Sequence, residues 1–457
     1  MPWVRAALVA LVLVGSLLAP ALPAHADAPH LVRDIDPGSA GSNPVDLVAI
    51  KGIVLFQADD GSTGPELWKS NASATGTALV RDIRPGGVGS VPADLPNVNG
   101  MPFFAAVDKT HGRELWKSNG TAAGTTMVTD INPGLSPSDP TDLVAVGSTV
   151  FFTANDGSNG TELWRSDGTP LGTVMVSDIA PGPGSSSPAN LIDVNGTVFF
   201  TANDGTNGVE LWKSDGTAAG TVLVKDILSG SGGSYPANLT NVNGRLAFTA
   251  NDGVLGTELW KSDGTAAGTR LIRDIDSQPM LGSFPASLTD VNGTLFFSAV
   301  DNKSHGRELW KSNGSSSGTV LVKDIAPGSL SSSPDSLGAF GTSLLFSAND
   351  GTNGAELWTS DGTAAGTMLV DDINPGSGGS SIGPPTVLGS AVFFSATDGS
   401  AHGQELWTSD ATTAGTMMVE DINPGSASSS PASLTVLGTT LMFSADDGVN
   451  GAELWAA

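Results

Sequence analysis

Glutamate recurs in the string Glu-Leu-Trp at nine places in the chain, and successive tryptophans of this string lie 48 to 50 residues apart. Two other acids recur with the same period: an aspartate before an isoleucine, as at Asp226, and an aspartate that opens a loop, as at Asp204. Carboxylates at fixed spacing can form ion pairs with lysine or arginine, or they can hold calcium, which prefers oxygen ligands. Which of the two applies depends on the elements that position the acids.

Ion pairing is the simplest role for the glutamate row. If Ser214 and Thr221 close a hairpin, Glu210 lies directly opposite Lys225 on the neighbouring strand. Opposite charges that face each other across a sheet stabilise it by roughly 0.2 to 1 kcal/mol per pair. The same offset predicts three more structural pairs, and closure of the chain into a ring adds a last one: Glu66 with Arg81, Glu258 with Arg273, Glu308 with Lys323, and Glu453 with Arg33.

Two repeats break this pairing rule. The same offset places Glu356 opposite Asp371 and Glu405 opposite Glu420, so that like charges face each other. Such carboxylates either remain solvated or take up a cation between them, and calcium accepts carboxylates together with loop carbonyls. We therefore predict calcium as the candidate cofactor at these four acids, with solvated acids or a different strand register as the alternatives.

No group of residues forms a recognisable catalytic site. The sequence lacks a Ser-His-Asp spacing, a metal-binding histidine pair and a phosphate-binding glycine loop. The residues that depart from the repeat include Arg84, Tyr235, Arg245 and the loop 276–284, and they supply no evident nucleophile, base and orienting group. The sequence therefore predicts a protein that is not an enzyme.

The repeat predicts short strands as the elements that carry these residues. The unit that starts at Leu191 contains the β-rich segments 191–194, 197–202, 209–214 and 221–227, which are separated by Asn-Gly, Asp-Gly and other turn signals. No segment of the unit has a helical period. A meander of four short strands that recurs every roughly 40 to 50 residues is typical of a β-propeller blade.

The two ends of the chain predict a closed ring. Residues Leu31 to Ile35 match the fourth strand of the unit without the preceding three, and the last unit stops after its third strand at Trp455. We therefore predict an all-β fold, a single closed β-propeller of nine four-stranded blades in which the N-terminal strand completes the last blade. Closure hides the strand edges. A stacked β-solenoid is the alternative.

The first 26 residues predict a secretory signal peptide. Arg5 precedes an apolar run, and small residues lead to a cleavage position before Asp27. The domain organisation is then a signal peptide at 1–26 and the nine-repeat propeller at 27–457. No later segment reaches about 18 uninterrupted apolar residues, so we expect a secreted, extracytoplasmic protein without a membrane span.

The composition narrows the class of partner. The formal net charge of −26 argues against nucleic acid or an anionic membrane as a partner, because both repel an acidic surface. The absence of cysteine excludes disulfides and thiolate metal sites. The nine repeated tryptophans either pack between blades or stack on sugar rings, and packing is the simpler interpretation.

The full motif resembles a known repeat family. The string Glu-Leu-Trp-Lys/Arg-Ser-Asp/Asn-Gly-Thr, complete at 162–169, 210–217 and 258–265, is similar to that of the ELWxxDGT repeat family of exported bacterial proteins, and the resemblance spans Leu31 to Trp455. It implies a bacterial extracytoplasmic repeat protein and implies no catalytic residues. Asn71-Ala72 and Asp410-Ala411 replace the usual Asp-Gly, so those two turns are expected to differ from the others.

From these features we predict a secreted, non-enzymatic scaffold for binding or adhesion. A surface glycan or protein would be the ligand, held by loops rich in serine, glycine and proline such as 375–384. The alternative is a secreted propeller enzyme, a polysaccharide lyase or glycosidase acting at the ring axis. That alternative requires Tyr235, Arg245 and acids to converge there.

Overall fold

Each repeat folds as four short antiparallel strands in a computed structural model that describes residues 28–278, 280–301 and 305–457. In the fourth repeat, β14 (Ala189–Val194), β15 (Thr197–Asn203), β16 (Val209–Ser214) and β17 (Val222–Lys225) pair in chain order. The Asn195-Gly196 turn between β14 and β15 has φ values of 54° and 82°. Asparagine and glycine tolerate this left-handed backbone, which a two-residue hairpin turn requires.

The other blades repeat this order. The first strands are β2 (Val45–Ile50), β6 (Asn97–Val98), β10 (Thr141–Val146), β18 (Ala237–Val242), β22 (Ala286–Val291), β26 (Asp335–Phe340), β30 (Thr386–Leu388) and β34 (Ala432–Leu437). The second strands are β3 (Ile53–Ala58), β7 (Met101–Val107), β11 (Thr149–Asn155), β19 (Arg245–Asn251), β23 (Thr294–Val300), β27 (Ser343–Asn349), β31 (Ala391–Thr397) and β35 (Thr440–Asp446). The third strands are β4 (Glu66–Ser70), β8 (Arg113–Lys117), β12 (Thr161–Ser166), β20 (Thr257–Ser262), β24 (Arg307–Ser312), β28 (Ala355–Ser360), β32 (Gln404–Ser409) and β36 (Ala452–Ala456). The fourth strands are β5 (Ala78–Arg81), β9 (Thr126–Thr129), β13 (Val174–Ser177), β21 (Arg270–Arg273), β25 (Val320–Lys323), β29 (Met368–Asp371), β33 (Met417–Glu420) and β1 (His30–Arg33).

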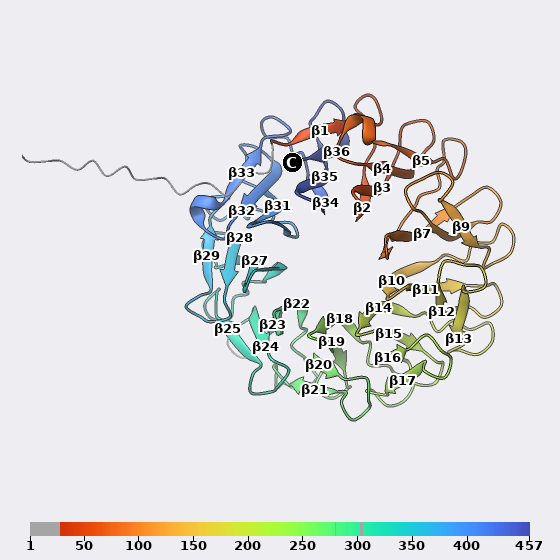
Figure 1. Ribbon diagram of the computed structural model, residues 1–457. Coiled ribbons are helices and arrows are strands. Elements are labelled where there is room, and N and C mark those ends of the chain that lie inside the picture. The colour runs from red at the N-terminus through yellow and green to blue at the C-terminus, as the bar shows by residue number, and fades with distance from the viewer. Residues whose placement is uncertain (1–27, 279, 302–304) are drawn as a thin grey trace, which may run out of the picture.

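The nine sheets stand around a ring, with the first strand of each blade innermost (Figure 1). We number them blade 1 (β2 to β5) to blade 9 (β34 to β36 with β1). Blade 9 joins the two ends of the chain, because β1 pairs with β36 and Leu31 lies opposite Trp455. The predicted nine-bladed, closed β-propeller is therefore confirmed, including its completion by the N-terminal strand.

The hydrophobic core lies between blades. Leu55 and Leu67 of blade 1 pack with Phe104 and Trp116 of blade 2, and an equivalent cluster occurs at each blade interface. The tryptophan of every Glu-Leu-Trp string is at most 9% exposed. These rings therefore pack between blades, as the simpler interpretation of the sequence predicted.

The two unusual turns keep the common backbone with a different residue. Ala72 and Ala411 have φ values of 65° and 69°, where blades 2 to 7 have glycine. Each of these turns continues into a short 3-10 helix, η1 (Ala74–Gly76) or η2 (Thr413–Gly415). The expected difference between these turns and the others is therefore present and small.

The predicted signal peptide at 1–26 lies outside the described residues, so its cleavage and the secretion of the protein stay predictions. Within the described part of the chain, no helix has the length and apolar character needed to cross a membrane.

Candidate functional site

The cations that were predicted to face glutamate lie opposite leucine instead. In blade 4, Trp212 pairs with Leu223, as the predicted hairpin requires, but the next residue, Leu211, pairs with Lys225. A β-bulge in β17 inserts one residue and shifts the register beyond it by one position. The same bulge recurs in the other blades concerned, so five predicted structural pairs are wrong: Glu66 with Arg81, Glu210 with Lys225, Glu258 with Arg273, Glu308 with Lys323, and Glu453 with Arg33.

These cations contact the next blade. Arg81 Nη1 donates a hydrogen bond to the carbonyl oxygen of Thr125 at 2.5 Å, and its guanidinium lies 5.7 Å from the ring centroid of Trp116. Cation–π contacts of this kind contribute about 0.5 to 1 kcal/mol at exposed sites. Equivalent contacts place Lys225 over Trp260, Arg273 over Trp310, and Lys323 over Trp358. The cation row therefore connects neighbouring blades.

The glutamate carboxylates hold the loops that lead to the next blade. Glu258 is buried, and its Oε1 accepts a hydrogen bond from the backbone N–H of Ser283 at 2.7 Å. Its Oε2 accepts from the Ser283 hydroxyl at 2.5 Å and from the N–H of Ile275 at 3.2 Å. An isoleucine N–H and a serine hydroxyl donate in the same way to Glu66, Glu114, Glu162, Glu210, Glu308, Glu405 and Glu453. These donors satisfy the carboxylates without a cation.

Glu356 departs from this arrangement. Its Oε2 accepts a hydrogen bond from the N–H of Ile373 at 2.9 Å, but its buried Oε1 has no hydrogen-bond partner. The backbone N–H and the hydroxyl of Ser380 instead both donate to the carbonyl oxygen of Ala355. Burial raises the pKa of Glu356 to about 7. Its carboxyl group is therefore partly protonated near neutral pH, which makes it a weaker metal ligand.

The four acids of the predicted calcium site differ in their surroundings. Glu356 and Glu405 are buried, whereas Asp371 lies opposite Leu357 and is half-buried. Glu420 is exposed, opposite Leu406 on the other strand of its pair. Among the described residues, no group of three or more His, Cys, Asp or Glu side chains is arranged to hold a metal ion. Calcium binding therefore stays a prediction.

The residues named for the alternative enzyme do not converge. Tyr235 precedes β18 and Arg245 follows it, so the two lie at opposite ends of that strand. Arg84 lies in the loop that follows β5 of blade 1, several blades away. The described part of the chain therefore does not assemble the predicted polysaccharide-cleaving site at the axis from these residues.

The inner wall of the ring is acidic. We define the inner wall as the nine first strands together with residues 93–96, which precede β6 and bridge to β7 through Ala93. It contains no lysine or arginine. Its carboxylates are those of Asp46, Asp94, Asp142, Asp193, Asp290 and Asp335. A wall with this composition attracts cations and repels anions.

Three of these acids form a group that we call the acidic arc: Asp46, Asp94 and Asp142, on blades 1, 2 and 3. Their φ values of 56°, 57° and 53° lie in the left-handed region, which aspartate tolerates better than most residues. All three are exposed. The pKa of Asp94 is raised because the surrounding protein removes part of the water around its carboxyl group, and because Asp46 and Asp142 repel it, although Arg113 opposes the shift.

The arc also connects adjacent blades. Asp142 Oδ2 accepts a hydrogen bond from the backbone N–H of Asn190, its equivalent on blade 4, at 3.0 Å. Sequence analysis missed this group, although the string Pro-x-Asp-Leu at 44–47, 92–95 and 140–143 carries its signal. The three aspartates form one group because the ring places residues that are 48 positions apart in the sequence on adjacent blades.

Comparison with known proteins finds similarity only to solved structures, and at low identity. The chain matches no protein-family model and no curated protein. Among solved structures it is similar to a puromycin hydrolase, with 13% identity and a TM-score of 0.44 over 91% of this chain and 60% of that one. Oligopeptidase B from Leishmania major shows 12% identity and a TM-score of 0.42 over 72% of this chain and 48% of that one. The β-propeller domain of the Trilobed protease from Pyrococcus furiosus shows 9% identity and a TM-score of 0.36 over 72% of this chain and 98% of that domain.

These structures correct the predicted function. They are hydrolases or a domain of one, and not glycan-binding adhesion proteins, so the prediction of an adhesion scaffold for a surface glycan or protein is contradicted. The chain spans about half to three fifths of the length of the first three similar structures. At this low identity, and with TM-scores below 0.5, the likeness carries no argument for peptidase activity in this chain.

Proposed function

We propose that the ring takes up a positively charged, extended polypeptide segment at its inner wall. The observation that carries this proposal is the charge of the inner wall, which has six carboxylates and neither lysine nor arginine. Clefts with one sign of charge concentrate ligands of the opposite sign and speed their association. Lysine and arginine side chains of such a segment would contact the acidic arc first, because its three carboxylates are exposed and repel one another.

The sheet edges support the same ligand. Each first strand is the innermost strand of its sheet and has a hydrogen-bonded neighbour strand on one side only. A strand edge of this kind offers backbone N–H and C=O groups to an extended chain. An extended polypeptide can form hydrogen bonds with these backbone groups and ion pairs with the carboxylates. A small organic cation can interact with the carboxylates only.

The experiment compares two triple variants of the mature chain. In the first, Asp46, Asp94 and Asp142 are changed to asparagine, which already occupies the equivalent positions Asn190 and Asn238. In the control, Asp167, Asp215 and Asp263 of the exposed turns between third and fourth strands are changed to asparagine, which three other blades carry as Asn71, Asn119 and Asn313. Each variant loses three negative charges. Because other blades carry asparagine at the equivalent positions, the fold should accept each substitution.

The probe is a short fluorescent lysine–glycine peptide, with a glutamate–glycine peptide as its negative counterpart. We expect the arc variant to bind the lysine peptide about tenfold more weakly than the wild type, because three modest charge contacts are lost together. The turn variant should bind like the wild type, and binding to the wild type should weaken as salt is added. Equal losses in both variants would show that net charge alone matters and would overturn the proposal.

A further inference from the structure

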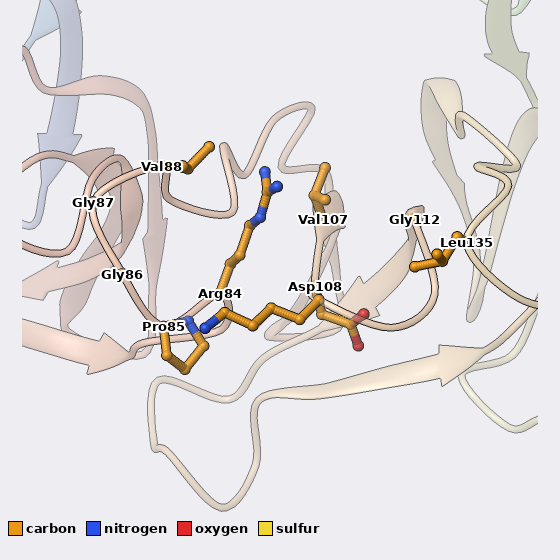
Figure 2. A pocket seen from close by; sticks show the side chains of 10 residues that line it. Arg84, Pro85, Gly86, Gly87, Val88, Val107, Asp108, Gly112 and Leu135 are labelled. Carbon is orange, nitrogen blue, oxygen red and sulfur yellow. The ribbon is translucent and has the colours of Figure 1, made fainter.

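A pocket of about 440 Å³ lies between blades 1 and 2, among the loops that connect them (Figure 2). Its walls come from residues 84–88, which follow β5, and from residues 107–109 and Gly112, at the end of β7 and in the loop that joins it to β8. Leu135, from the loop that follows β9, completes the wall. In the view of Figure 2 the side chain of Arg84 rises between Val88 and Val107. Pockets that hold small molecules in proteins typically measure about 300 to 1,000 Å³.

Two lining residues, Arg84 and Lys109, depart from the repeat. At the position of Arg84 the other blades have an uncharged residue or an aspartate, and at the position of Lys109 the other described positions are glycines: Gly61, Gly157, Gly205, Gly253, Gly351, Gly399 and Gly448. The two positions adjoin across the blade interface. A Cβ atom on Gly157 would lie 2.6 Å from Oδ1 of Asn132, and one on Gly448 would lie 2.6 Å from Oδ1 of Asn423. Arg84 and Lys109 therefore lie next to each other between blades 1 and 2, whereas the equivalent described interfaces have a glycine in place of the lysine.

Among the described residues, no carboxylate side chain forms an ion pair with Arg84 or Lys109. Within the described residues, the side chains of Arg84 and Lys109 form no ion pair and no hydrogen bond, while the remaining wall supplies one carboxylate, that of Asp108. Asp108 Oδ1 accepts hydrogen bonds from the N–H groups of Thr110 and His111, and Oδ2 pairs with Nδ1 of His111. The nearby carboxylate of Glu66 is buried and accepts the backbone N–H of Arg84.

Four apolar side chains also line the pocket. Val88 and Leu135 are 65% and 75% exposed, so their side chains are available for contact, and Pro85 and Val107 line the same space. Two unpaired cations beside an apolar surface suit a ligand that carries one anionic group on an apolar body. A guanidinium binds a carboxylate through two parallel hydrogen bonds, and an adjacent ammonium adds a second charge-assisted bond.

We propose that this pocket binds a small organic carboxylate, with Arg84 and Lys109 on the carboxylate and Val88, Val107 and Leu135 on the apolar group. The site is independent of the inner wall, which attracts cations. It gives a chain of net charge −26 a local preference for an anion.

The test uses 3-phenylpropionate as the probe, with its neutral amide and inorganic phosphate for comparison. The variant Arg84→Asn with Lys109→Gly restores residues that other blades carry at these positions, as in Asn132 and Gly157. The control variant Lys51→Asn with Arg245→Thr also removes two positive charges, but from the turns between first and second strands, far from the pocket. Asn195 and Thr197 occupy the equivalent positions in blade 4. Binding is measured by calorimetry and by ligand-observed NMR.

We expect the wild type and the control variant to bind 3-phenylpropionate, and the pocket variant to bind it about tenfold more weakly or not at all. The amide should bind much more weakly than the carboxylate, which identifies the charge as the recognised feature. Unchanged affinity in the pocket variant would overturn the proposal. Equal or tighter binding of phosphate would also overturn it, because the apolar wall would then contribute nothing.

Discussion

Glu453 and Ser42 lie 411 residues apart in the chain and are joined by two hydrogen bonds. The backbone N–H of Ser42 donates to Glu453 Oε1 at 2.9 Å, and its hydroxyl donates to Oε2 at 2.6 Å. Glu258 and Ser283 form the same pair of bonds within one stretch of chain. Ring closure therefore uses the same contact that connects consecutive blades elsewhere.

Substituting Glu453 with alanine should free the N-terminal segment. The change leaves the buried N–H groups of Ile35 and Ser42 without an acceptor, and each such group costs about 1 to 3 kcal/mol. Hydrogen exchange should therefore rise in β1 and at Ser42. In the matched variant Glu308→Ala, faster exchange should appear at Ile325 and Ser332 instead. Unchanged protection of β1 in the Glu453 variant would contradict the proposed role of this glutamate in closure.

Substituting Glu356 with glutamine should stabilise the protein at alkaline pH. The pKa of Glu356 in the folded state is about 7, above its ordinary value of 4.5, so the folded state binds more protons between these two values. Stability should consequently fall as the pH rises through this range, and the full penalty applies above about pH 7. Since glutamine does not ionise, the melting temperature of Glu356→Gln should exceed that of the wild type at pH 8, and the difference should shrink towards pH 5.

The control for this experiment is Glu308→Gln. Both oxygens of Glu308 accept hydrogen bonds, and an amide NH₂ group would face the donors of Ser332. We therefore expect Glu308→Gln to lower the melting temperature at both pH values. A pH-independent effect of Glu356→Gln would show that its carboxyl group does not titrate in this range.

Lysine at positions 371 and 420 should strengthen two blade interfaces. The equivalent cations Lys225 and Lys323 lie over the tryptophan of the following blade, whereas Asp371 and Glu420 place carboxylates at these positions. Each substitution, Asp371→Lys or Glu420→Lys, should stabilise the fold by about 0.5 to 1 kcal/mol through a new cation–π contact. Chemical denaturation measures the gain, and Lys323→Asp should show the reverse change.

The same lysine substitutions test the calcium hypothesis. If calcium binds the four acids Glu356, Asp371, Glu405 and Glu420, calcium should raise the melting temperature of the wild type relative to chelator. The double variant Asp371→Lys with Glu420→Lys should lose this response. Equal melting temperatures of the wild type with calcium and with chelator would refute the hypothesis.

Three histidines that pair with an aspartate should have pKa values above the usual range for histidine. The hydrogen bond with Asp108 raises the pKa of His111, and the same holds for His305 with Asp301 and for His402 with Asp398. The contribution of the pair to stability is present below the ordinary pKa of about 6.5 and is lost as the pH rises through the higher folded value. An NMR titration should place the His111 pKa above the ordinary histidine value of about 6.5, and Asp108→Asn should lower it. An unchanged pKa in that variant would exclude the pair as its cause.

The architecture could be predicted from the sequence because the repeat carries it redundantly. Nine copies of one unit fix the number of blades, and the partial units that end at Ile35 and begin before Trp455 fix how the ring closes. The pairing of Glu210 with Lys225 could not be predicted in the same way. The bulge after Leu223 shifts the register by one residue, and neither Val224 nor Lys225 distinguishes a bulged strand from a regular one.

The candidate site could be predicted only in part. Asp46, Asp94 and Asp142 were visible as a recurrent string, but their proximity follows from the ring and not from the order of the chain. Arg84 was recognised as a departure from the repeat, whereas its neighbour Lys109 becomes meaningful only when the two loops meet across the interface. Nearly identical units contain few unique residues, so function depends on small departures whose partners lie in other units.

The closure of the ring through β1 and Glu453 also determines how the chain can fold. Eight interfaces form between blades that are adjacent in sequence, whereas the ninth must wait until the two ends of the chain meet. Closing a loop of about 400 residues costs roughly 2 kcal/mol more entropy than closing one of about 50. We therefore expect the ring to close last in folding, so that blades 1 and 9 lack their contact with each other until the two ends of the chain meet. At high protein concentration, blades 1 and 9 of one molecule can pair with those of a second molecule. The product would be a domain-swapped dimer in place of a single ring.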